Sequence, residues 1–228
     1  YYEMLIEKNK VMNLTGITEF QDVVEKHFLD SLCLVKAFPE LNAEKLLDLG
    51  TGAGFPGIPL KIAFPDLQIV LMDSLNKRIG FLEEVISQLN LKDIFAIHGR
   101  AEEMARKREY RQQFDLCVSR AVANLSSLAE YCIPFVKIGG YFVSYKSADV
   151  DGEADQAKKA VFLMGGKIDH IIKFSLPGSD QGRSLICISK EKGTPKTYPR
   201  KADSRILNCL SAIAQSCYRM ANDIRLLQ

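Results

Sequence analysis

Short apolar runs alternate with longer amphipathic stretches along most of the chain. The short runs are typical of buried strands, and the stretches with apolar positions three and four apart predict helices. We expect seven strands, at 46–49, 69–72, 95–98, 114–120, 141–146, 168–174 and 184–190. Because helices separate most of them, the pattern predicts an α/β fold, a doubly wound and mostly parallel sheet with helices on both faces. The short polar stretch 177–183 predicts a late hairpin, and therefore one antiparallel strand.

Two further helices are expected before the first strand. Residues 1–9 have an apolar side, and Thr18 is a candidate N-cap for a helix that runs to about Phe38. His27 lies on the apolar face of that second helix, where it either packs or faces a substrate. The expected domain organisation is an N-terminal helical extension (1–40), a ligand-binding domain (41–190), a basic linker (191–201) and a C-terminal amphipathic helix (202–228).

A glycine-rich turn follows the first predicted strand: Asp48-Leu49-Gly50-Thr51-Gly52-Ala53-Gly54-Phe55-Pro56-Gly57. Its glycines permit positive φ angles and let a ligand approach bare backbone, and Pro56 suits the start of a helix. A strand, a glycine turn and a helix form a nucleotide-binding cradle at the carboxyl end of a parallel sheet. The turn satisfies the dinucleotide fingerprint, but that pattern alone is weakly specific, and no Walker lysine follows it.

Asp48 separates the two cofactor classes that fit this turn. A carboxylate at the strand end repels a pyrophosphate and attracts the amino group and sulfonium of S-adenosylmethionine, so Asp48 favours the latter over NAD. A solvated or capping carboxylate is the alternative interpretation of Asp48. Asp73 ends the second strand and is placed for ribose hydroxyls in either cofactor.

Two cations end later strands on the same ligand-binding edge. Arg120 follows the fourth strand and Lys146 the fifth, so both are candidates to hold a substrate oxygen or phosphate. Membership of a structural ion pair is the alternative for each.

Composition narrows the class of protein. The net charge is +2, the six cysteines form no CxxC pair, and there are three histidines. We therefore expect buried free thiols and no metal site. The absence of a long apolar run or a signal-peptide pattern predicts a soluble, cytoplasmic protein with no membrane partner.

The end of the chain is basic and then amphipathic. Lys196, Arg200 and Lys201 surround Tyr198 between two prolines, a pattern that suits an extended segment tracking RNA phosphates, although a solvated linker is the alternative. Apolar residues then recur at alternating steps of four and three, which predicts a helix that packs on another helix. These are Ile206, Leu210, Ile213, Cys217, Met220, Ile224 and Leu227.

Several motifs, in order, resemble the bacterial 16S ribosomal RNA guanine-N7 methyltransferases once called glucose-inhibited division protein B. The matching segments are 9–15, 26–31, 48–60, 73–78, 99–102, 119–121, 145–146 and 194–201. The resemblance implies a Rossmann-like class I methyltransferase, S-adenosylmethionine as cofactor, and 16S rRNA or the small ribosomal subunit as partner. It also implies that Gly50 and Phe55 line the cofactor loop, Asp73 meets the ribose, Ala101 and Glu102 meet the adenine, and Arg120 borders cofactor and substrate.

The resemblance ends near Lys201. The family continues into a Pro/Gly-rich tail, whereas residues 210–227 resemble a helix of the adenylosuccinate lyase group. A lone helix cannot supply lyase chemistry, and the origin of this helix stays open. The expected protein is a monomer that can make a helix-mediated contact through 202–228.

The implied chemistry explains why the sequence offers no convincing acid–base pair. Guanine N7 has a free lone pair, so its methylation requires no proton removal and depends mainly on positioning. The N7 edge of A-form RNA lies in a groove that proteins cannot enter, so the target base is expected in a loop or extruded. An NAD-dependent oxidoreductase and a non-catalytic RNA-binding module are the alternatives.

Overall fold

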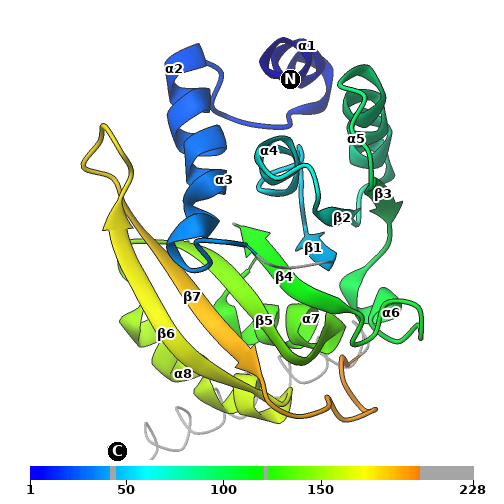
Figure 1. Cartoon of the computed structure of the whole chain (residues 1–228), viewed down its shortest axis with the longest axis vertical. Helices are drawn as coiled ribbons and strands as arrows, with labels where there is room; N and C mark the ends of the chain where they lie inside the picture. The colour runs from blue at the N-terminus through cyan, green and yellow to red at the C-terminus, as the bar shows by residue number, and fades with distance from the viewer. Residues whose placement is uncertain (42–44, 121–122, 201–228) are drawn as a thin grey trace, which may run out of the picture.

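The structure is a computed structural model that describes residues 1–41, 45–120 and 123–200. Its centre is a seven-stranded sheet with the order β3-β2-β1-β4-β5-β7-β6 (Figure 1). The strands are β1 Lys45–Leu49, β2 Gln68–Asp73, β3 Ile94–His98, β4 Phe114–Arg120, β5 Val136–Ser147, β6 Gly166–Ser175 and β7 Gly182–Lys190. Strands β1 to β5 pair in parallel, and β7 alone runs against its neighbours β5 and β6. The predicted fold class is confirmed, including its one reversed strand.

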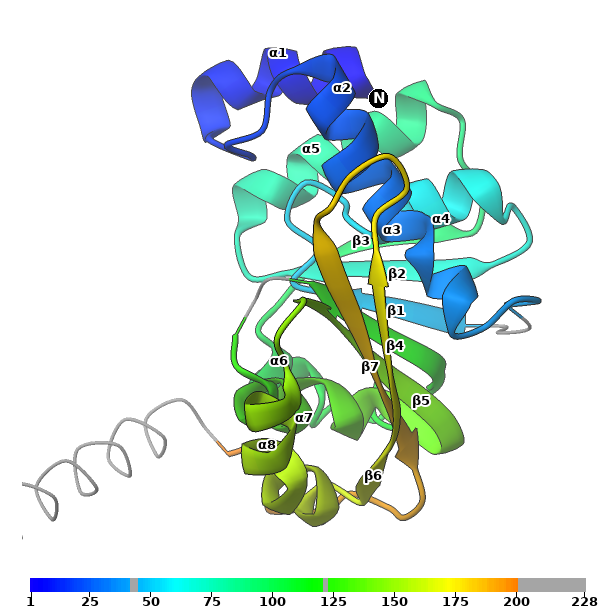
Figure 2. The same ribbon diagram turned by 90° about the vertical axis from the view of Figure 1, so that its left-hand side faces the viewer.

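Helices cover both faces of this sheet (Figure 2). One layer comprises α1 Tyr2–Met12, α2 Phe20–Val23, α3 Asp30–Leu32, α4 Gly57–Ala63 and α5 Asn76–Gln88, and the other comprises α6 Ala101–Met104, α7 Leu125–Cys132 and α8 Asp151–Leu163. Alternate strand residues point to opposite faces. Leu46 therefore belongs to the core cluster beneath the first layer, and Leu47 to the cluster beneath the second.

The second N-terminal helix differs from its prediction. It runs from α2 through a π-helical segment, Val24–Leu29, into α3 and a 3-10 turn, Cys33–Lys36. Its N-cap is Glu19, not Thr18, and the Thr18 carbonyl accepts a hydrogen bond from the Tyr2 hydroxyl at 2.9 Å. The π-helical segment shifts the phase of the helix at His27, and such segments often lie at functional sites.

The predictions for the cysteines, for a membrane segment and for the C-terminal helix can be compared with the described residues. Cys33, Cys117, Cys132 and Cys187 are buried free thiols, as predicted. No helix in the described ranges is long and apolar enough to cross a membrane. Lys201 and the predicted helix 202–228 lie outside the described residues.

Candidate functional site

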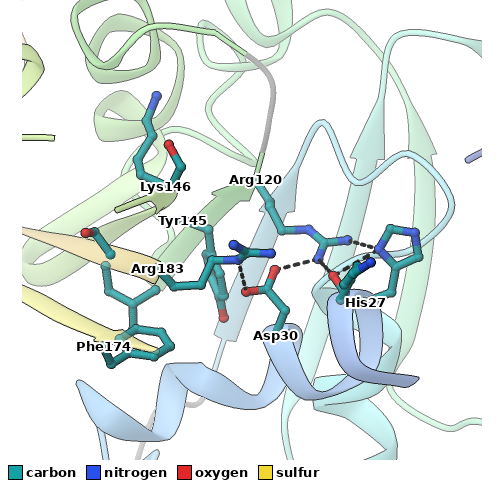
Figure 3. A pocket seen from close by; sticks show the side chains of 11 residues that line it. His27, Asp30, Arg120, Tyr145, Lys146, Phe174 and Arg183 are labelled. Carbon is teal, nitrogen blue, oxygen red and sulfur yellow. Dashed lines mark hydrogen bonds and ion pairs between the residues drawn. The ribbon is translucent and has the colours of Figure 1, made fainter. Parts of the chain in front are cut away.

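Three pockets lie in series along the carboxyl ends of the parallel strands. The strand-end pocket, about 410 Å³, lies beside Gly50, Asp73 and Glu102. The loop pocket, about 210 Å³, lies against the glycine turn and shares Gly50 with the first. The hairpin pocket, about 510 Å³, shares His27 and Arg120 with the loop pocket and reaches the β6–β7 hairpin (Figure 3). Neighbouring pockets share wall residues. A molecule that fills the strand-end pocket and the loop pocket would therefore have one end next to the hairpin pocket.

The glycine turn leaves room for a ligand at one position and closes against the core at another. Gly52 has φ +62°, and a Cβ built there meets nothing within 4 Å. A Cβ on Gly57 would lie 2.3 Å from Leu71 Cδ2 and 2.9 Å from Asp48 Oδ2. Gly52 therefore offers open backbone to a ligand, and Gly57 lets α4 pack directly on the sheet.

Asp48 lies beneath the turn and not in the wall of these three pockets. Its carboxylate is fully buried, and its Oδ2 accepts hydrogen bonds from Thr51 Oγ1 at 2.6 Å and Gly57 N at 2.8 Å. The predicted role of Asp48 toward a cationic ligand stays a prediction. Since its partner Gly57 begins α4, the alternative of a capping carboxylate describes its geometry. Burial raises the pKa of Asp48 to about 6.

Gly54 also lies apart from the pocket walls. A Cβ there would lie 2.4 Å from Ile58 Cδ1, so Gly54 faces the start of α4. Phe55, in contrast, lines the loop pocket, and the His27 ring stacks on it with a centroid separation of 4.6 Å.

Asp73 forms the floor of the strand-end pocket and organises its surroundings. Its Oδ2 accepts a hydrogen bond from Gly52 N at 3.0 Å and pairs with Arg78 at 3.1 Å, while its Oδ1 accepts from Leu75 N at 2.9 Å. The carboxylate thus ties β2 to the glycine turn. Ala101 and Glu102, at the start of α6, line the same pocket, as their predicted role requires.

Leu75 and Tyr131 also line the strand-end pocket, and sequence reasoning missed both. Leu75 is 42% exposed although it is a large apolar residue. The sequence did contain a signal for Leu75, because it is an apolar residue inside the otherwise polar turn after β2. Tyr131 comes from α7, so no local pattern connects it with the turn.

Arg120 is held at the junction of the loop pocket and the hairpin pocket. Its Nη1 donates to Asp30 Oδ2 at 2.8 Å and to the Lys26 carbonyl at 3.1 Å. Its guanidinium carbon lies 5.2 Å from the centre of the Phe55 ring, within cation–π range. Arg120 is therefore both a member of a buried ion pair and a wall of both pockets, and its two interpretations are not exclusive.

His27 is uncharged at neutral pH in this setting. Its Nε2 lies 2.8 Å from Thr15 Oγ1, and its Nδ1 lies 3.3 Å from Arg120 Nη2. Burial, followed by the charge of Arg120, lowers the pKa of His27 to about 4. The side chain packs on Phe55 and also faces both pockets, so it combines the two roles that its helix position allowed.

Lys146 lines the hairpin pocket, with its ammonium engaged by the protein. It donates to Glu153 Oε1 at 2.7 Å and to the Ala123 carbonyl at 2.9 Å. Asp30, Phe174 and Arg183 line the same pocket, and sequence reasoning did not single them out. Asp30 lies in the matching segment 26–31 but received no role there, and no motif marks Phe174 or Arg183, which come from the hairpin.

The basic segment near the C-terminal end is docked on the domain. Arg200 pairs with Glu130 at 2.7 Å, and its backbone N donates to the same carboxylate at 2.6 Å. Arg111 donates to the carbonyls of Thr194 and Tyr198 at 2.8 and 3.0 Å. Residues 194–200 therefore contact the domain through these bonds, while the side chain of Lys196 is exposed, and the RNA-binding role of the segment stays a prediction.

No group of three or more His, Cys, Asp or Glu side chains in the described ranges is placed to hold a metal ion.

Comparison with known proteins identifies the family. The sequence model of the GidB family, described as rRNA small subunit methyltransferase G, matches residues 1–182. The chain belongs to this family. A ribosomal RNA small subunit methyltransferase G from Lachnoclostridium phytofermentans is 60% identical over 88% of this chain and 83% of its own length. The protein of the same name from Clostridium tetani is 50% identical over 89% of this chain and 84% of its own.

A solved structure supports the fold independently of sequence. The S-adenosylmethionine-dependent methyltransferase SibL superimposes with a TM-score of 0.57 at 12% identity, over 72% of this chain and 55% of its own. The family assignment also covers the glycine turn, Asp73, Ala101, Glu102 and Arg120. The pockets described above are therefore those of a methyltransferase family member, which makes them the candidate active site.

Proposed function

We propose that this protein transfers a methyl group from S-adenosylmethionine to N7 of a guanine in 16S rRNA of the small ribosomal subunit. The observation that carries the proposal is the series of three pockets. Gly50 is shared by the strand-end and loop pockets, and Arg120 is shared by the loop and hairpin pockets. A two-substrate transfer requires neighbouring sites that meet at the reacting atoms. Membership of the rRNA small subunit methyltransferase G family supports the choice of acceptor.

The residues present fit the cofactor. In the strand-end pocket, Asp73 would accept from ribose hydroxyls, while Leu75, Ala101 and Glu102 would surround the adenine. In the loop pocket, Gly50, Gly52 and Phe55 would face the methionine portion, and the open backbone at Gly52 fits a close approach. Gly54 would act indirectly, by letting the turn pack against the start of α4. Asp48 would attract the cationic cofactor through its negative charge without touching it, and its hydrogen bonds to Thr51 and Gly57 would fix the shape of the turn. When bound, S-adenosylmethionine supplies a methyl group on a sulfonium.

The acceptor side needs positioning more than proton transfer. The N7 lone pair of guanine is free, so no residue has to remove a proton. Arg120 and Lys146 would hold O6 or a phosphate of the acceptor, and neutral His27 adds no positive charge beside a purine that becomes cationic. The contribution of the protein is the near-attack geometry at the junction of the pockets.

The basic residues Lys196, Arg200 and Lys201 remain candidates for RNA phosphates. Exposed Lys196 supports this role, while Arg200 first satisfies Glu130. An enzyme acting on ribosomal RNA would work in the cytoplasm.

The test uses small ribosomal subunits from cells that lack this modification, with tritiated S-adenosylmethionine. We expect tritium in 16S rRNA, recovered as 7-methylguanosine after nuclease digestion, and none with subunits from modified cells. Nicotinamide absorbance changes with no methyl transfer would favour an oxidoreductase. RNA binding without S-adenosylhomocysteine binding in calorimetry would favour a non-catalytic module.

A further inference from the structure

The hairpin pocket is lined by four cationic side chains, Lys26, Arg120, Lys146 and Arg183. Asp30 pairs with both arginines, Asp22 pairs with Lys26 and Glu153 pairs with Lys146, so the group keeps an excess of one positive charge. A pocket of about 510 Å³ is within the usual size of small-molecule sites. Its charge suits an anionic group, and a single extruded nucleotide brings one phosphate with its base.

Arg183 is oriented by a carboxylate that is itself buried. Its Nε donates to Asp30 Oδ1 at 3.1 Å, while Arg120 takes Asp30 Oδ2 at 2.8 Å (Figure 3). Asp30 is 5% exposed, so this ion pair lies largely out of water. Arg183 Nη1 and Nη2 each make one further contact, to the Gly182 carbonyl and to Gln181 Oε1. Since each Nη carries two N–H groups, one donor on each nitrogen is left for a ligand.

The hairpin places an aromatic ring next to this guanidinium. Phe174 on β6 and Arg183 on β7 are directly opposite each other in the antiparallel register, and both line the pocket. Cross-strand neighbours on one face lie about 5 Å apart. Aromatic rings stack on unpaired bases, and guanidinium groups match phosphate oxygens with two donors. This pair therefore offers complementary contacts to the two ends of one nucleotide.

The two arginines differ in their place along the pocket. Arg120 also borders the loop pocket, so it lies on the side of the transferable methyl, whereas Arg183 is a wall of the hairpin pocket only. We propose that Arg183, held by Asp30, binds the phosphate of the acceptor nucleotide beside Phe174 and thereby fixes the base between Phe174 and Arg120. This inference rests on the proposed function, because it assigns a nucleotide to the acceptor pocket.

The test compares Arg183→Gln and Arg183→Lys with the unaltered enzyme on unmodified small subunits. In Arg183→Gln we expect KM for the subunit to rise about 10- to 100-fold, since one charge-assisted contact is lost. We expect the log–log salt dependence of subunit binding to flatten by about 0.7, the value for one phosphate on a single strand. Arg183→Lys should keep the salt slope and recover part of the affinity. S-adenosylhomocysteine affinity should not change in either variant.

Lys173→Gln is the matched control. Lys173 precedes Phe174 on β6, but its ammonium pairs with Asp151 on α8 at 2.6 Å and does not line the hairpin pocket. The variant loses the same charge from the same hairpin. We expect its KM and salt slope to stay at the values of the unaltered enzyme.

A second measurement needs no variant and decides the question if Arg183→Gln fails to fold. With S-adenosylhomocysteine bound, the unaltered protein should bind guanosine 5′-monophosphate at least about 10-fold more tightly than guanosine. Equal affinities would overturn the inference, as would an unchanged salt slope in folded Arg183→Gln. An unaltered enzyme that transfers no methyl to the subunit would instead overturn the proposed function.

Discussion

The glycine turn and the hairpin pocket lie on either side of Arg120 and are built in different ways. The turn, residues 48–57, is one continuous segment whose backbone forms the wall, and Asp48 and Asp73 hold it from below. The hairpin pocket has walls made of side chains from an N-terminal helical segment, two parallel strands and an antiparallel hairpin. The shape of the glycine turn depends on few side chains. The hairpin pocket depends on ion pairs between residues far apart in the sequence, and single substitutions can remove each of these pairs.

The largest expected effect is in the turn. Gly52→Val adds a branched side chain at φ +62° in the open space that a ligand would occupy, so we expect S-adenosylhomocysteine affinity to fall by roughly 100-fold or more, measured by calorimetry. Gly178→Val is the control, because Gly178 has φ +84°, equally open surroundings and a place in the distant hairpin turn. We expect the two variants to lose similar amounts of stability and only Gly52→Val to lose cofactor affinity. Normal cofactor affinity in Gly52→Val would move the cofactor site elsewhere.

The next effect concerns the residue between the two regions. Arg120→Ala should lower kcat/KM by about 100-fold, since a donor beside the reacting atoms is lost, and should leave S-adenosylhomocysteine affinity within a few-fold. It should also cost about 3 kcal/mol of stability, because Asp30 is buried and keeps only Arg183.

Glu130→Gln separates these two consequences of Arg120→Ala. It weakens a different ion pair, between buried Glu130 and partly exposed Arg200, and neither residue lines the three pockets. Denaturant unfolding should show reduced stability with turnover within about 3-fold of normal, because the pocket walls and the charge of Arg200 are kept. Comparable turnover in Arg120→Ala and Glu130→Gln would reduce Arg120 to a structural role.

The third effect is a pH dependence of stability that arises from Asp48 beneath the glycine turn. Burial raises the pKa of Asp48 from 3.8 to about 6, so the folded state binds more protons than the unfolded state between these values. The stabilising contribution of protonated Asp48 is complete below pH 3.8 and is lost as the pH rises through 6. Relative to Asp48→Asn, the unaltered protein should therefore lose up to about 3 kcal/mol between pH 4 and 6 and change little above pH 7. A flat difference in urea unfolding across this range would contradict the assignment.

The smallest effect tests the basic segment beyond the hairpin. Lys196→Ala should flatten the salt dependence of RNA binding by about 0.7, because exposed Lys196 is free to reach a phosphate. Arg200→Ala should chiefly lower the melting temperature, since Arg200 holds Glu130. Filter binding across a salt series measures the first, and thermal unfolding the second. A larger slope change in Arg200→Ala than in Lys196→Ala would restore Arg200 as the main RNA contact.

Much of the cofactor side could be predicted because its information is local. Periodicity placed the seven strands, and strand ends marked Asp73 and Arg120 on the ligand edge, where the structure has them. The same logic placed Asp48 at the strand end but could not give its depth, because a one-dimensional pattern carries no information about burial. Asp48 is fully buried under the turn.

The sequence by itself determined the sheet, its one reversed strand and the glycine turn, since these depend on periodicity and on backbone freedom within a few residues. Only the tertiary structure decided the partners of charged side chains. Asp30 and Arg183 are 153 positions apart, yet they share a hydrogen bond of 3.1 Å. Arg200 is a candidate RNA contact by its sequence, and only the structure shows that it also pairs with Glu130. A buried charge needs a partner, and the fold, not the neighbouring sequence, determines which partner lies within reach.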